Sequence, residues 1–442
     1  MYIRIVRTLL ALLALALTNS AYALTCPAPL TSGKSLMITD LSVVEDPVRT
    51  AWSGSTTTTS DGAWSFGRLM ANMAGPHNPS DFVRNWLKNW ETARQVNHFT
   101  VAARPSIKSL VIDPWPKLRN GKLDLTRAPM HLLAIVYRPD LRDLSKRKAG
   151  EGRFVFGVLD PAGAPLSFMV ILEYSLPAKT KTDVRNWALA LQKLSTLKFG
   201  SAYNRELEKI TNRFTGKNVA PTKINGSSIS QVRTNEVALD FPWELREFRL
   251  HTRNKSLREV TVQQTPALDF NNTAILADWV NANTAAIIGG SGNKSIEVPL
   301  SFNGVPFRAG AIANNIDVWD SSATNREAMF RVAINTCNGC HGAETNTGFL
   351  HISPRERGSV SSLSGFITGT TTGTPATTTI SVSDPRDGST TREFNELEFR
   401  KADLTAIICP PHKKTPAVAP PDALGRATTG KLGRGPSVNL AH

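Results

Sequence analysis

The sequence predicts an α+β fold, in which an antiparallel-sheet-rich N-terminal domain with helices precedes a small, mostly helical domain. Three observations support this prediction. Apolar runs separated by turn residues lie between residues 132 and 174, helical spacing recurs between 183 and 214, and a helical pattern returns after residue 309. A chain of 442 residues also exceeds what one core usually supports, so we place the domains at residues 24–308 and 309–412.

The first residues have the pattern of a secretory signal peptide. Arg4 and Arg7 supply a positive start, and residues 8–18 form an apolar run too short to span a bilayer. Ala21-Tyr22-Ala23 fits the cleavage site, so the mature chain is expected to begin at Leu24. The alternative is an N-terminal membrane anchor. We therefore expect a periplasmic or secreted protein with no transmembrane segment in the mature chain.

The extended segments are expected to form adjacent strands of an antiparallel sheet. Residues 132–137, 154–159 and 168–174 are apolar runs bounded by turn chemistry. Further strands are expected at residues 229–239, 243–251 and 257–263. Alternation assigns most of their polar series to a solvated sheet face, with a buried ion-pair cluster or ligand site as the alternative: Arg233, Glu236, Glu244, Arg246 and Glu247.

Helical spacing predicts helices on both sides of these strands. A first helix is expected from residue 81, with Ser80 as its N-cap. Thr324 and Glu327 predict a capping box at the start of another. The remaining segment, residues 413–442, is rich in Pro, Gly and Lys and is expected to be a disordered tail. The expected helices lie at residues 183–197, 203–214, 273–287, 320–335 and 392–408.

One motif has specific chemical meaning: Cys337-Asn338-Gly339-Cys340-His341, which follows the helix expected at 320–335. Cys-x-x-Cys-His is the spacing used for covalent attachment of c-type haem. The two thiols form thioethers to the haem, and the next residue, His341, is the expected proximal iron ligand. The cofactor expected from this motif is one covalently attached haem c.

Two other interpretations of the motif remain open. The first is a small-loop disulfide between Cys337 and Cys340. The second is a zinc site, which needs two further ligands, although only His351 is close in the sequence. A thioredoxin-like site is less consistent with the sequence, because the motif follows a helix instead of a strand.

Through the motif and the helix before it, the chain resembles c-type cytochromes, and the domain at 309–412 is accordingly expected to be cytochrome c-like. Such domains usually have a distal Met downstream of the motif, but this chain has no Met after Met329. His351 is therefore the candidate distal ligand, with a core or supporting histidine as the alternative. Met329 is a further candidate, although it lies on the helix that leads into the motif, from which the opposite haem face is hard to reach. The other downstream histidines are His412 and His442.

Most of the mature chain also resembles a group of secreted bacterial proteins of unknown function. The resemblance rests on segments such as residues 132–142, 150–156, 233–236 and 242–248. It implies a shared architecture and supplies no activity.

These observations leave three functions open. The leading one is an exported monohaem c-type cytochrome-like protein that binds haem and transfers electrons. The second is a haem peroxidase or oxygenase whose substrate pocket involves the N-terminal domain. The third is a disulfide-stapled binding protein without haem. Filled axial positions on the iron favour electron transfer, whereas an open position favours catalysis.

The remaining cysteines and the net charge bear on partners. With Cys337 and Cys340 occupied, Cys26 and Cys409 are expected to form a disulfide, because free thiols rarely persist in an oxidising compartment. The chain has a formal charge of +15 and a pI near 9.8. The basic residues are spread along the chain, so we expect an acidic redox partner and no nucleic acid.

Overall fold

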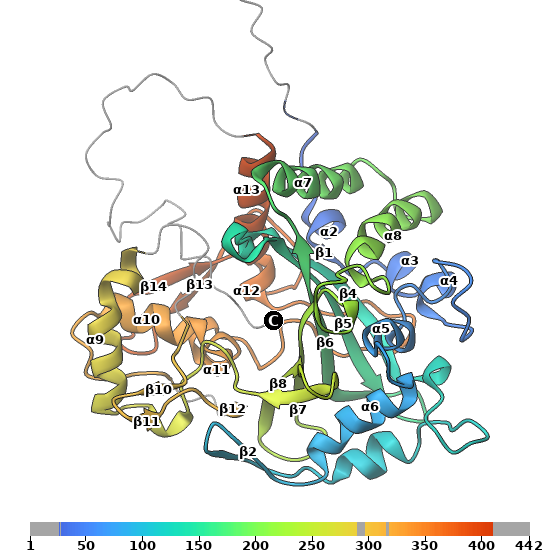
Figure 1. The fold of residues 1–442 in the computed structure, drawn as a ribbon. Coiled ribbons are helices and arrows are strands. Elements are labelled where there is room, and N and C mark those ends of the chain that lie inside the picture. The colour runs from blue at the N-terminus through green and yellow to red at the C-terminus, as the bar shows by residue number, and fades with distance from the viewer. Residues whose placement is uncertain (1–25, 27, 290–296, 315–317, 410–442) are drawn as a thin grey trace, which may run out of the picture.

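The computed structural model describes residues 26, 28–289, 297–314 and 318–409. The signal peptide predicted at residues 1–23, the tail predicted at 413–442, His412 and His442 lie outside the described residues. The predicted α+β class is confirmed, since a large antiparallel sheet occupies the centre with helices around it (Figure 1).

The described residues form an eight-stranded sheet with the order β1-β4-β5-β6-β7-β8-β12, and β9 pairs with β8. Every pairing in it is antiparallel. The six strands expected from the sequence are present as β4 to β9, but β1 and β12 were not anticipated. The strands are β1 (Met37–Ile38), β4 (Met130–Arg138), β5 (Lys148–Leu159), β6 (Pro165–Pro177), β7 (Ile229–Glu236), β8 (Trp243–Leu250), β9 (Leu257–Val260) and β12 (Ile312–Asn314).

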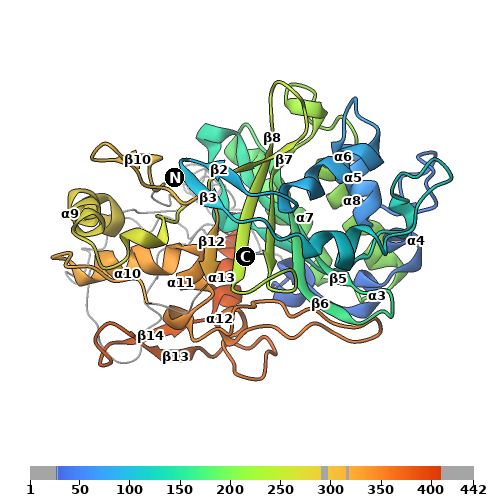
Figure 2. The same cartoon turned by 90° about the horizontal axis from the view of Figure 1, so that it is seen from below.

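Helices of the N-terminal half cover one face of this sheet (Figure 2). Helices α3 and α5 contact β4, α7 contacts β5 and α8 contacts β6. The N-cap of α6 is Asn78, followed by Pro79, so the prediction of Ser80 as the cap is wrong. The helices are α2 (Ser32–Ser35), α3 (Leu41–Val44), α4 (Pro47–Thr50), α5 (Phe66–Met73), α6 (Pro79–Leu87), α7 (Lys181–Ser195) and α8 (Ser201–Thr215), and a hairpin joins β2 (Arg94–Val96) to β3 (Phe99–Val101).

Elements of the C-terminal segment lie on the opposite side of the sheet from α5, α6 and α8 (Figure 2). Helix α10 begins at Arg326 with Asn325 as its cap, which corrects the capping box predicted at Thr324. Residues 391–394 form a strand, so the last helix begins later than predicted. The elements are α9 (Ala274–Gly289), β10 (Ser301–Phe302), β11 (Val305–Pro306), α10 (Arg326–Asn335), α11 (Cys337–Cys340), α12 (Gly365–Thr368), β13 (Ile380–Ser383), β14 (Thr391–Phe394) and α13 (Glu396–Ile408).

The two predicted domains contribute to the same sheet and to the same apolar core. Strand β12, which follows the boundary predicted at 308/309, pairs with β8 of the large sheet. Phe366, Leu397 and Leu404 belong to the same apolar core as the central strands. A disulfide joins Cys26 to Cys409, with their Cα atoms 5.7 Å apart. Among the residues that the structure describes, no helix has the length and apolar character needed to cross a bilayer.

Candidate functional site

The Cys-x-x-Cys-His motif forms a single helical turn, α11, directly after α10. The Thr336 hydroxyl caps this turn by accepting a hydrogen bond from the Gly339 N–H at 3.0 Å. A side chain at Gly339 would place its Cβ 2.1 Å from the Ala333 carbonyl oxygen, so only glycine fits here. The His341 N–H donates to the Cys337 carbonyl at 3.0 Å, which places His341 immediately after the turn.

The two motif cysteines are buried in different parts of the interior. Cys337 belongs to an apolar cluster that includes side chains of α9 and α10, whereas Cys340 belongs to the core on the central sheet. Both are free thiols, so they form no Cys337–Cys340 disulfide here. Burial raises the pKa of Cys337 to about 11 and raises that of Cys340 well above its usual value, so both sulfurs are protonated at neutral pH.

The His341 imidazole is oriented by the backbone of Phe349. Its Nδ1–H donates to the Phe349 carbonyl at 2.6 Å, and the Phe349 N–H donates in return to the His341 carbonyl at 3.1 Å. Burial lowers the pKa of His341 to about 4, so the ring is neutral. With its proton on Nδ1, the ring presents an unprotonated Nε2, which is how protein histidines usually bind metals.

Phe349 adopts a backbone conformation that is unusual for a bulky residue. Its φ is 64°, in the left-handed region that non-glycine residues rarely enter. Such conformations cost about 1–3 kcal/mol and persist where the surroundings hold them. Here the reciprocal hydrogen bonds to His341 and stacking of the ring on Trp243, with centroids 5.8 Å apart, hold it. The strained residue therefore positions the His341 imidazole.

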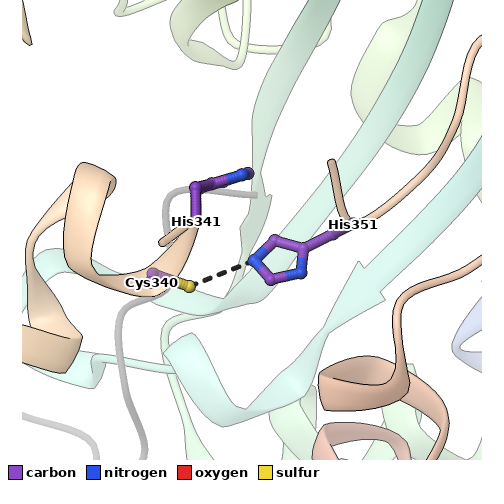
Figure 3. A group of neighbouring side chains, drawn as sticks. All are labelled: Cys340, His341 and His351. Atoms are coloured by element: carbon purple, nitrogen blue, oxygen red, sulfur yellow. Dashed lines mark hydrogen bonds between the residues drawn. The ribbon is translucent and has the colours of Figure 1, made fainter. Parts of the chain in front are cut away.

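His351 lies against two residues of the motif, Cys340 and His341 (Figure 3). Its Nδ1 is 2.8 Å from the Ser364 hydroxyl oxygen, and its Nε2 is 3.2 Å from the Cys340 sulfur. The ring centroids of His341 and His351 are 4.3 Å apart. Burial lowers the pKa of His351 well below its usual value, so this ring is also neutral. The structure thus brings together Cys340, His341 and His351, three of the residues that the sequence nominated.

A small apolar cavity adjoins the two histidines. Its free volume is about 20 Å³, which is room for about one water molecule. Its walls come from both sides of the interface between the sheet and the C-terminal segment. The lining residues are Met37, Val136, Arg153, Val155, Met169 and Ile171 of the sheet, and His341, His351, Ile352 and Ile367 of the C-terminal segment.

Beside this cavity the sheet carries a cluster of buried charges. Arg153 pairs with Glu151 at 2.7 Å and with Glu173 at 3.3 Å. Arg233 pairs with Glu247 at 3.1 Å and lies 3.6 Å from the same Glu173 carboxylate. Arg233 also lies near Cys337, where its charge opposes the effect of burial on the pKa of the thiol.

The prediction of a solvated face for the polar series on β7 and β8 is therefore wrong. Arg233, Glu236 and Glu247 are each no more than 5% exposed, and Glu244 and Arg246 are buried as well. Glu244 and Arg246 form a second cluster that includes Arg104, whose guanidinium is 2.8 Å from Glu244. Charged side chains are usually solvated, but this sheet is covered on both faces, so they pair with one another instead.

Sequence reasoning missed the wall that the strands contribute. Met37 and Met169 precede the motif by more than 150 residues, whereas the distal Met of c-type cytochromes is expected downstream of it. One signal was available, since Arg153 and Val155, and likewise Met169 and Ile171, are two residues apart on strands and must share a face. That these residues share the wall with Met37 of β1, two strands away from β5, and lie opposite His341 depends on topology and register.

Comparison of the chain with protein-family models, with curated proteins and with solved structures finds no match. The chemistry of the site is therefore argued from its own residues. These are a capped Cys-x-x-Cys turn, two neutral histidines with ordered Nδ1 partners and an apolar wall supplied by the sheet.

Proposed function

We propose that this protein is an exported monohaem c-type cytochrome-like protein that transfers electrons. In this proposal Cys337 and Cys340 hold one haem c covalently, and His341 is the proximal iron ligand. The observation that carries the proposal is the hydrogen bond from His341 Nδ1 to the Phe349 carbonyl, at the end of a Cys-x-x-Cys turn. It orients Nε2 of the residue that the motif requires as a ligand.

The chemical character of these residues suits haem. The motif side chains are buried, the sheet side of the cavity is mostly aliphatic or thioether, and Arg153 supplies a cation at its edge. The free volume of about 20 Å³ is much smaller than a porphyrin. Haem binding therefore requires the segment around His351 and Ile352 to move away from the sheet.

The roles of this chain's own groups follow from the site. The thioethers retain the haem in an exported protein, Phe349 keeps the His341 ring in one tautomer and orientation, and the aliphatic wall excludes water. Haem, when bound, supplies an iron centre that stores one electron. The buried arginines and glutamates beside the cavity supply fixed charges that influence its potential.

The proposed location and partner rest on the sequence. In this proposal a signal peptide ends at Ala23 and directs the protein to the periplasm or outside the cell, an oxidising setting in which the Cys26–Cys409 disulfide persists. The formal charge of +15 favours an acidic redox partner through long-range attraction.

Covalent attachment is tested by a haem stain after denaturation. The full chain, exported in a host with haem-attachment machinery, should retain its colour through acid-acetone extraction. Cys337→Ala and Cys340→Ala should each weaken attachment, and His341→Ala should remove the proximal ligand. A colourless wild-type protein from such a host would end the haem proposal and leave the disulfide-stapled binding protein.

The distal position separates electron transfer from catalysis. If His351 is the second iron ligand, the ferric protein should be low-spin, and His351→Ala should make it high-spin and open to cyanide. A wild type that is already high-spin would favour the peroxidase or oxygenase alternative. A Met–iron absorption band would instead indicate a thioether ligand, and Met37→Leu, Met169→Leu and Met329→Leu would then show which one.

A further inference from the structure

Cys340, His341 and His351 form a compact set of potential ligands without any added group (Figure 3). The Cys340 sulfur and one ring nitrogen of each histidine all lie within 4.8 Å of one another. Ligands around a single ion with bonds of about 2.0–2.3 Å are about 3.5–4 Å apart. A shift of about 1 Å at the widest separation is therefore enough to enclose one metal ion.

Each histidine is supported as metal-binding histidines usually are. The Nδ1 of His341 bonds to the Phe349 carbonyl, and the Nδ1 of His351 bonds to the Ser364 hydroxyl. These contacts fix both rings and direct each Nε2 to the site. All three ligand residues are buried, with none more than 1% exposed. The arrangement is therefore a preorganised interior site.

The donor types select a soft metal. The set contains one sulfur and two imidazole nitrogens, without a carboxylate. Met37 and Met169 line the same cavity and offer thioether sulfur as an additional weak ligand. Thiolate ligands favour Cu(I) and zinc, imidazole suits both of these metals, and thioether adds a preference for Cu(I), whereas carboxylate and water favour hard cations.

Charge separates copper from zinc at this site. A Cu(I) ion with one thiolate has zero net charge, whereas Zn(II) with the same ligands keeps one positive charge. That excess would be buried in an apolar cavity, where the nearby Glu151 and Glu173 carboxylates are already paired with Arg153. Burial of an uncompensated charge is costly, so the monovalent ion is favoured.

We infer that the chain without haem binds one Cu(I) ion through Cys340 Sγ, His341 Nε2 and His351 Nε2. The ion displaces the thiol proton, which leaves to solvent, and no oxidation state changes. This inference goes beyond the haem proposal and does not depend on it. Cys340 cannot be a thiolate ligand and a haem thioether at once, so copper and covalent haem exclude each other.

The test uses the full chain produced without haem-attachment machinery and kept anaerobic. Titration with Cu(I) against a chromophoric Cu(I) chelator should give one bound ion per chain, and X-ray absorption should show sulfur and imidazole ligands. Zn(II) should bind more weakly. Failure to take Cu(I) from the chelator, or a preference for Zn(II), would overturn the inference.

Variants identify the ligands. Cys340→Ser and His351→Ala should each weaken Cu(I) binding by about 100-fold or more, whereas the matched Cys337→Ser should change it by less than about 3-fold, because Cys337 is not in the set. Equal losses in both cysteine variants would contradict the assignment. Where a ligand variant does not fold, Ser364→Ala keeps every ligand and should still weaken binding by about 10-fold. An unchanged affinity in that variant would count against the site.

The two proposals fail separately. A chain that acquires haem in an attachment-competent host but does not bind Cu(I) beforehand would overturn only the copper site. A chain that binds Cu(I) but never acquires haem would overturn only the cytochrome proposal. Cys337→Ser provides the clearest contrast, since it should impair haem attachment and retain copper binding.

Discussion

Arg153 forms buried ion pairs within the sheet and also lines the cavity, so one substitution affects both. Its side chain is 4% exposed, pairs with Glu151 at 2.7 Å and Glu173 at 3.3 Å, and lines the cavity beside His341. Arg153→Met removes the guanidinium but keeps much of the aliphatic stem. Two buried carboxylates then lose a partner. Glu151 keeps Lys148, and Glu173 keeps the Gln231 amide at 2.6 Å and Arg233 at 3.6 Å.

Breaking a buried pair by removing one partner costs about 3–5 kcal/mol, because the remaining charge stays buried. We therefore expect Arg153→Met to lower the free energy of unfolding by about that amount. Urea unfolding followed by tryptophan fluorescence measures it, since the chain has nine tryptophans. The double variant Arg153→Met/Glu173→Gln should lose less, because it removes one of the stranded charges.

The matched control is an exposed pair. Lys193 pairs with Glu206 at 2.9 Å, but the lysine side chain is 61% exposed. Lys193→Met should therefore cost less than about 1 kcal/mol. The reasoning is refuted if Arg153→Met costs no more than this control, or if neutralising Glu173 in the double variant recovers nothing.

Three further predictions concern other parts of the chain. Non-reducing peptide mapping should find the Cys26–Cys409 bridge; the loop-entropy model gives it about 6 kcal/mol for a sequence separation of 383, so Cys26→Ser should strongly lower the urea midpoint. Burial lowers the pKa of His131 from 6.5 to about 4. The neutral ring therefore contributes fully to stability above pH 6.5, and this contribution, up to about 3 kcal/mol, is lost as the pH falls toward 4. His131→Gln should make the free energy of unfolding less dependent on pH over that range. Phe349→Gly should retain the haem spectrum, because glycine tolerates positive φ and keeps the carbonyl that orients His341. Phe349→Pro should change the spectrum, because the proline ring forbids that φ. Equal spectra for the two variants would contradict the positioning role of Phe349.

The strands and the motif were predictable because both depend on local sequence. The apolar runs in β4, β5 and β6 are long and bounded by turn residues. The haem-attachment motif is complete within five consecutive residues, 337–341, so its spacing can be recognised without the fold. His351 was identifiable because it is only ten residues from His341. The cap of α10 was misplaced by one residue, since Thr324 and Asn325 are both good caps and the tertiary structure decides between them.

The opposite wall of the site was not predictable in the same way. That Met169 lies near His341 depends on the order of strands in the sheet and on which face the C-terminal segment covers. The buried charges were misassigned for a related reason. Alternation correctly separated Arg233 and Glu247 from the apolar residues, but a single strand does not reveal that its second face is also covered.

Helix α11 lies where two apolar clusters meet, so its two cysteines are held by different parts of the chain. Cys337 packs with the cluster of α9 and α10, and its N–H donates to the Thr265 hydroxyl at 3.1 Å. Cys340 packs on the sheet, and its carbonyl accepts from the Thr345 hydroxyl at 2.6 Å. A group bound to both sulfurs would therefore link the two clusters. Because β1, β4, β5 and β6 supply the facing wall, the N-terminal sheet is part of the site itself and more than a neighbouring domain.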